Sequence, residues 1–161
     1  MTKIWGPSTW CFLHSFIARL DAEKFEKNKN NIIDFIRSVL ANLPCPICSD
    51  HAIKYINSKI RYVNKKNDLC LLFYHFHNEV TIRNSKYKKP ELPDIDILNI
   101  YKNNNVRKEF NIYYELWQKS TNQRNILTMS STFMKHSYIN NAIQWLKHNN
   151  HLLEKGSFVP Y

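Results

Sequence analysis

Hydrophobic residues recur every three or four positions through the first part of the chain, which is the spacing of an α-helix. Over residues 7–20 this spacing predicts a first amphipathic helix, with Ser8 placed to cap its N-terminus. After a polar joint over residues 27–31 the spacing returns and predicts a second helix over 32–43. The chain is therefore expected to open with a pair of helices.

Two prolines bracket Cys45 and mark the start of the next helix. Because proline is tolerated in the first turn of a helix, a third helix should begin within Cys45–Cys48 and run to about Tyr55. A loop over 57–67 rich in Asn and Lys then leads to a fourth helix over 68–83. This arrangement puts the cysteine pair at a helix N-terminus.

The chain changes character after residue 104. Residues 86–93 are expected to form a loop and 94–103 a short fifth helix, which completes a first domain over 1–104. In an appended segment over 105–161, helical spacing predicts further helices from the apolar residues Phe110, Tyr113, Tyr114, Trp117, Ile139, Ile143, Trp145, Leu146 and Leu152. The predicted fold is all-α: a four-helix bundle, a short fifth helix and a C-terminal helical extension.

The composition excludes some common nucleotide-binding sites. The 161 residues include only two glycines, so neither a GxGxxG loop nor a P-loop can be present. No apolar run reaches the roughly 20 residues that span a bilayer, and no secretion signal is visible, so we expect a soluble protein. The net charge of +10 suits several anionic partners, but the basic residues are scattered among Asn-rich loops, which disfavours nucleic acid.

Cysteine chemistry is the clearest functional signal. At a helix N-terminus the helix dipole stabilises a thiolate, which lowers a cysteine pKa from about 8.5 to roughly 3.5–7.5. The CxxC over residues 45–48 is therefore suited to thiol–disulfide exchange, and a structural zinc half-site is the alternative. Cys11 and Cys70 are single, and His75 and His77 point to different sides of their helix, so no metal is expected.

Two further interpretations of the CxxC have less support. A thioredoxin-like fold would place a β-strand before the cysteine pair, whereas the residues before Cys45 follow helical periodicity. His51 is a conceivable third zinc ligand, but no fourth ligand lies at a suitable spacing. The redox interpretation is therefore favoured.

Three segments in fixed order connect the CxxC to a known family. Residues 5–14 follow the pattern WGxxxWxxLH, residues 43–52 follow LPCxxCxxHA, and residues 77–80 follow HNxV. In this order and at similar separations they resemble the signature blocks of the Erv/ALR sulfhydryl oxidases, over residues 4–103. The LPCPxC form followed by His-Ala is most similar to members carried by large DNA viruses.

The resemblance implies a helical bundle that binds FAD without a Rossmann fold and oxidises protein dithiols to disulfides. Electrons would pass from the substrate dithiol to the Cys45–Cys48 disulfide, then to FAD, and then to dioxygen, giving hydrogen peroxide. Cys45 would be the outward sulfur that the substrate attacks, and Cys48 the sulfur beside the flavin. The cofactor-binding positions that the resemblance implies are Gly6, Trp10, His14, His51, His77, Asn78, Val80, Thr81, Arg83 and Lys86.

Some positions depart from the family pattern. Thr81 stands where the third block of the family ends in Asn, and Asn84-Ser85-Lys86 replaces Leu-Gly-Lys. The part of the pocket that would hold the FAD phosphates therefore differs most from the family pattern. Trp5 is expected to pack at the edge of the pocket. The sequence holds no second cysteine pair near either end, so Cys45 is expected to react directly with a partner's thiols.

The resemblance also implies partners and a location. Thiol-containing proteins or a thioredoxin-like relay protein would be the substrates, and a homodimer through the first two helices is expected. A viral member would act in the host cytoplasm or the virion, where thiols are otherwise kept reduced. The competing function is a flavin-free interaction module of the same fold, and the retained cysteine pair together with His14 and His77 argues against it.

Direct reaction at Cys45 gives a first prediction. A Cys11→Ser, Cys70→Ser double variant should keep its thiol oxidase turnover, because neither cysteine is expected to relay electrons. Oxygen consumption with dithiothreitol as the substrate measures this. Loss of all turnover in the double variant would show that one of the two is a relay.

Overall fold

The computed structural model describes residues 4–84, 99–122 and 129–157. Its regular structure in these ranges is helical, apart from one isolated bridge between Leu20 and Leu153. The helices are α1 (Gly6–Ala18), α2 (Ala22–Ala41), α3 (Pro46–Lys59), α4 (Lys66–Asn84), α6 (Val106–Asn122) and α7 (Met129–Asn149), with the 3-10 turns η1 (Ile60–Tyr62) and η2 (Asn150–Leu152). The all-α prediction is confirmed.

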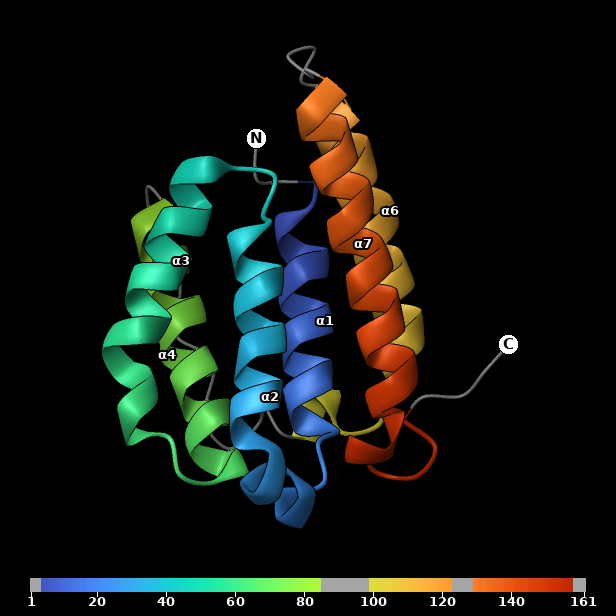
Figure 1. Ribbon diagram of the computed structural model, residues 1–161. Coiled ribbons are helices and arrows are strands. Elements are labelled where there is room, and N and C mark those ends of the chain that lie inside the picture. Colours follow the sequence, from blue (N-terminus) through green and yellow to red (C-terminus); the bar gives the residue numbers. More distant parts are fainter. Residues whose placement is uncertain (1–3, 85–98, 123–128, 158–161) are drawn as a thin grey trace.

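The helices are arranged around a central pair, α1 and α2. Figure 1 shows α3 and α4 on one side of this pair and α6 and α7 on the other. On the first side α1 packs against α4 and α2 against α3, and on the second side α1 packs against α6 and α2 against α7. The pair therefore has neighbours on two opposite faces.

Helix α1 is covered along almost all of its length. From Ser8 to Ala18 none of its residues is exposed. The spacing of its large apolar residues predicted an amphipathic helix, but Ser8, Thr9, His14 and Ser15 are buried as well. A helix that is buried on every side is expected where it lies between two layers of other helices.

Aromatic rings join the central pair to α6 and α7. The Phe12 ring stacks on Tyr113 with centroids 5.4 Å apart, and the Phe35 ring stacks on Trp145 at 4.0 Å. Such pairs contribute about 0.5–1.5 kcal/mol beyond the burial of their area. One hydrophobic core thus runs from α1 to α7. The boundary between residues 1–104 and 105–161 stays a prediction.

Two expectations about the first helices are wrong in detail. Ser8 does not cap α1, because the helix already begins at Gly6, and the Ser8 hydroxyl donates to the Trp5 carbonyl. The polar joint over 27–31 lies inside α2, where it is reduced to a kink at Asn28. The Asn28 side chain donates to the Lys24 carbonyl and so supports the kink from within the helix.

The predicted loop over 57–67 is largely helical. Helix α3 continues to Lys59 and η1 follows directly, because the fully buried Ile56 keeps the last turn of α3 packed on the core. Helix α4 starts at Lys66, and the Asp68 carboxylate accepts hydrogen bonds from the N–H groups of Asn64 and Lys65. The loop is therefore shorter than its polar composition indicated.

The loop predicted over 86–93 lies outside the described residues. The two helices expected after residue 104 are α6 and α7. Of the short fifth helix predicted over 94–103, residues 99–101 are helical, and its first residues lie outside the described part of the chain. Across the described ranges, no helix reaches the length and hydropathy that a bilayer-spanning segment requires.

Phe12 of α1 is buried against α6, and this burial gives a stability prediction. Phe12→Ala should lower the free energy of unfolding by about 3–5 kcal/mol, because it leaves a cavity against Tyr113 and Phe110. Ile112→Ala, on the solvent side of α6, is the control and should cost within about 0.5 kcal/mol. Urea denaturation measures both, and equal losses would contradict this account of the core.

Candidate functional site

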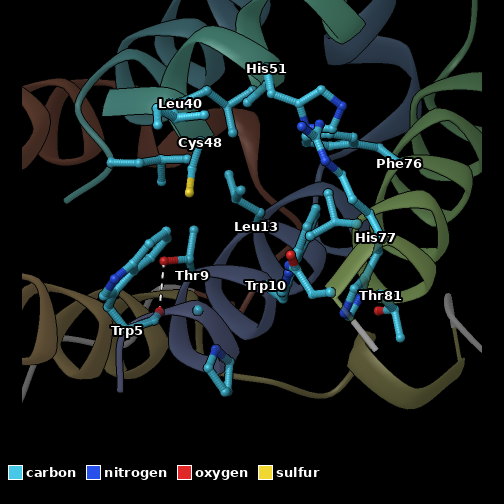
Figure 2. A pocket seen from close by; sticks show the side chains of 18 of the residues that line it. Trp5, Thr9, Trp10, Leu13, Leu40, Cys48, His51, Phe76, His77 and Thr81 are labelled. Carbon is cyan, nitrogen blue, oxygen red and sulfur yellow. Dashed lines mark hydrogen bonds between the residues drawn. The ribbon is translucent and has the colours of Figure 1, made fainter. Parts of the chain in front are cut away.

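A cavity of about 820 Å³ opens between α1, α2, α3 and α4. This volume lies within the range of roughly 300–1,000 Å³ that cofactor and small-molecule sites occupy. Aromatic rings and aliphatic side chains form most of the wall, and Figure 2 shows them converging from the four helices. The cavity can therefore hold a large planar ligand.

The two motif cysteines form a disulfide at the mouth of this cavity. Cys45 and Cys48 are bonded, and their Cα atoms are 5.1 Å apart. Cys45 is the N-cap of α3, and its sulfur accepts a hydrogen bond from the Cys48 N–H at 3.3 Å. Figure 2 shows the Cys48 sulfur pointing into the cavity, whereas Cys45 does not line it. The two sulfurs thus have different surroundings.

The opposite wall contains Trp10 and His77, and His14 lies behind them. The Trp10 ring stacks on His77 with centroids 4.2 Å apart, and His14 Nε2 lies 3.0 Å from His77 Nδ1. His14 is buried and does not itself line the cavity, and Tyr101 stacks on its far side at 5.1 Å. The contact between the two histidines joins α1 to α4.

Both histidines are uncharged at neutral pH. Burial lowers the pKa of His14 from 6.5 to about 3, with a smaller contribution from His77, and burial lowers the pKa of His77 to about 4. A neutral imidazole has one N–H and one bare nitrogen, so the 3.0 Å contact is a hydrogen bond when only one of the two facing nitrogens carries its proton. This wall offers hydrogen bonding and stacking without adding positive charge.

A smaller cavity of about 420 Å³ lies between α3 and α4 beside the first. Asn78 lines it, and the Asn78 amide nitrogen is among the few buried side-chain atoms of the described residues without a hydrogen-bond partner. Arg83 borders both cavities, which places a cation where they meet. On the same helix pair, His51 lies 3.0 Å from the Glu79 carboxylate.

The structure brings most of the predicted site residues together. The predicted cofactor-binding positions that line the large cavity are Gly6, Trp10, His51, His77, Val80, Thr81 and Arg83. His14 lies behind them, Asn78 faces the smaller cavity, and Lys86 lies outside the described residues. Trp5 is buried and borders the cavity as expected.

Several lining residues escaped the sequence analysis. They are the mainly apolar positions Pro7, Thr9, Leu13, Leu40, Leu43, Ile47, Ala52, Phe76, Asn84 and Tyr101. Apolar residues of this kind could not be separated from ordinary core positions by spacing alone. Tyr101 could be placed beside His14 only once the packing of the chain after residue 98 was known.

The other two cysteines are free thiols and do not bond to each other. Burial raises the pKa of Cys11 to about 12, helped by the Glu109 carboxylate, to which the thiol donates at 3.0 Å. Burial also raises the pKa of Cys70 to about 12. Both are poor nucleophiles at neutral pH. Among the described residues, no group of three or more His, Cys, Asp or Glu is placed to hold a metal.

The lowered histidine pKa values predict a loss of stability in acid. Below pH 6.5 the unfolded chain binds protons on His14 and His77 that the folded chain does not bind. The free energy of unfolding should therefore fall from pH 6.5 to about 4, by up to about 1.4 kcal/mol per pH unit for each ring.

Urea denaturation at pH 7 and pH 5 tests this. His14→Asn should reduce the difference between the two pH values, whereas the same substitution at the exposed His148 should keep the wild-type difference. A His14→Asn variant with the full wild-type difference would show that His14 is not the group responsible.

Comparison with known proteins gives relatives that match a little more than half of the chain. The 096R protein of Invertebrate iridescent virus 3 is 35% identical over 92 residues, covering 56% of this chain and 60% of that protein. The FAD-linked sulfhydryl oxidase of African swine fever virus is 30% identical over 82 residues, which cover 51% of this chain and 69% of the viral protein.

A cellular protein is similar over a segment of comparable length. The mitochondrial FAD-linked sulfhydryl oxidase of Saccharomyces cerevisiae is 29% identical over 86 residues, covering 53% of this chain and 44% of the yeast protein. The comparison with solved structures gave no significant match. The Erv1 / Alr family matches residues 7–102, which contain the disulfide and most of the described cavity wall. Because this match spans more than half of the chain, the protein belongs to the Erv1 / Alr family.

Proposed function

We propose that this protein is an FAD-linked sulfhydryl oxidase that converts protein dithiols to disulfides. The observation that carries the proposal is the position of the Cys45–Cys48 disulfide, which presents one sulfur to a large ring-lined cavity. The names of the relatives from African swine fever virus and yeast support the same activity. The alignment with the iridescent virus protein spans 60% of that protein.

The residues of the cavity fit FAD. Trp10 and His77 offer flat ring surfaces for a planar ring system, and Arg83 offers a cation for phosphate oxygens. The unpartnered Asn78 amide nitrogen can donate to an adenine or ribose acceptor. Gly6, His14, His51, Val80, Thr81 and Lys86 are proposed as further cofactor-binding residues. When bound, FAD would accept two electrons from a dithiol and pass them to dioxygen, giving hydrogen peroxide.

Disulfide exchange begins at Cys45. A substrate thiolate attacks the Cys45 sulfur and forms a mixed disulfide, while the bond to Cys48 breaks and Cys48 leaves as a thiolate. The dipole of the α3 N-terminus favours that thiolate. A second substrate thiolate then attacks the substrate sulfur, releases Cys45 and completes the substrate disulfide. The two electrons of the substrate then reside in the reduced cysteine pair.

The residues around the cysteine pair set the charge and the polarity of the cavity wall. The buried neutral pair His14 and His77 keeps positive charge away from that wall, so the Cys48 thiolate is stabilised mainly by the helix terminus. Most of the cavity wall is apolar, with Leu13 and Phe76 among its residues, and so offers little polar surface to water. Such a wall protects electron transfer from side reactions.

We also propose the partners and the setting. The substrates are thiol-containing proteins or a thioredoxin-like relay protein that reaches Cys45, and dioxygen is the final acceptor. The viral relatives support action in the host cytoplasm or the virion, where a dedicated oxidase is needed because glutathione keeps thiols reduced.

Homodimerisation through the first two helices stays a prediction. The faces of α1 and α2 that point away from the cavity pack against α6 and α7 within the same chain. Phe12 and Phe35, which lie on these faces, are almost fully buried by this packing. A homodimer through the first two helices would therefore have to use the parts of them that α6 and α7 leave exposed.

The absorption spectrum of the flavin tests the proposed function. The purified protein should carry the visible flavin band, lose it with dithiothreitol under anaerobic conditions, and regain it in air. Cys48→Ser should abolish this bleaching while keeping bound flavin, because it removes the sulfur that faces the cavity. Cys70→Ser, at a thiol remote from the disulfide, is the matched control and should bleach like the wild type. A colourless protein that refuses added FAD would favour the interaction-module function instead.

A further inference from the structure

The connection between α2 and α3 carries the reactive disulfide. Helix α2 ends at Ala41 and α3 begins at Pro46, so only residues 42–45 lie between them. Leu43 lines the cavity and Cys45 is the sulfur open to substrate in the proposed function. The position of this short segment therefore sets the position of the disulfide relative to the cavity.

One end of the segment is held by a residue from the C-terminal helices. The Trp117 indole N–H of α6 donates to the Asn42 carbonyl at 2.6 Å. Asn42 is the C-cap of α2, where carbonyl groups lack partners within the helix. This hydrogen bond links the extension directly to the backbone three residues before Cys45. Trp117 does not line the cavity and so has no contact with a ligand held there.

Trp117 is itself fixed by aromatic neighbours. Its ring is 3% exposed and packs on Tyr138 of α7 with centroids 5.6 Å apart. The Tyr138 hydroxyl lies 2.9 Å from that of Tyr113, whose ring stacks on Phe12 of α1. These contacts connect Trp117 directly to α7 and, through the two tyrosines, to α1, so its hydrogen bond to Asn42 links the segment to a packed aromatic cluster.

We infer that Trp117 is a positioning residue for the Cys45–Cys48 disulfide, so that the C-terminal helices take part in the redox reaction. This inference rests on the proposed function. It assigns Trp117 an effect on the attack at Cys45 and on the orientation of Cys48, and no effect on the later reaction of reduced flavin with dioxygen. Misplacing a reacting group by about 1 Å can cost roughly 100-fold in rate, so loss of one constraint should be measurable.

Trp145 provides a matched control within the same extension. Its indole N–H donates from α7 to the Asn31 side chain at 3.0 Å, and its ring stacks on Phe35. Asn31 lies 11 residues before Asn42 in α2, which is about 16 Å along the helix away from the disulfide. Trp117 and Trp145 thus both tie the extension to α2, but only Trp117 does so beside the cysteine pair.

The test compares Trp117→Phe with Trp145→Phe in the full-length, flavin-loaded protein. Each variant keeps an aromatic ring and loses the N–H donor. Anaerobic stopped-flow measures the rate of flavin bleaching by dithiothreitol, and mixing the reduced protein with air-saturated buffer measures reoxidation. Trp117→Phe should slow bleaching by about tenfold. Its flavin spectrum and reoxidation rate should stay at wild-type values, and Trp145→Phe should bleach and reoxidise like the wild type.

Other outcomes would overturn the inference. Wild-type bleaching in Trp117→Phe, or equal slowing in both variants, would show that the extension acts only through general stability. If Trp117→Phe does not fold, benzothienylalanine at position 117 keeps the bicyclic ring without the N–H, and slow bleaching is again expected. A wild-type protein that binds flavin but is not bleached would refute the proposed function, and the role of Trp117 with it.

Discussion

Burial of the α1–α2 pair from two opposite sides is the constraint on which both halves of the structure depend. On one side, Trp10 and Leu13 contribute to the wall of the cavity. On the other side, Phe12 and Phe16 pack with rings from α6 and α7. Because neighbouring positions on one helix serve the two sides, the cavity wall and the surface that holds the extension are parts of the same two helices.

The chemistry of the site depends on where its few polar groups lie within this apolar packing. The disulfide lies at the start of α3, where the helix dipole favours a thiolate. The imidazole pair lies deep between α1 and α4, where burial removes its charge. The cations of the chain, by contrast, lie mostly at the surface, with Arg83 at the cavity's edge. The helix terminus that favours a thiolate thus belongs to α3, whereas the rings that would pack against the cofactor lie on α1 and α4.

Much of this could be predicted from the sequence, for physical reasons that also explain the failures. Proline at the start of α3 is a local signal, so the cysteine pair was correctly placed at a helix N-terminus, and the four-residue spacing of Trp10 and His14 put their rings on one face of α1. The kink at Asn28 and the contact of Trp117 with Asn42 depend on tertiary packing, which overrides local preference. Residues such as Leu40 and Phe76 look like core residues, and only the arrangement of helices shows that they border a cavity.

The continuous burial of α1 limits which of its residues can be substituted during evolution. From Ser8 to Ala18 there is no solvent-facing position that could accept substitutions freely. A change in side-chain volume there disturbs either the cavity or the contact with the extension, and interiors packed at high density transmit such strain. Substitutions are therefore accepted more readily on the exposed faces of the other helices than anywhere along α1 after its first turn.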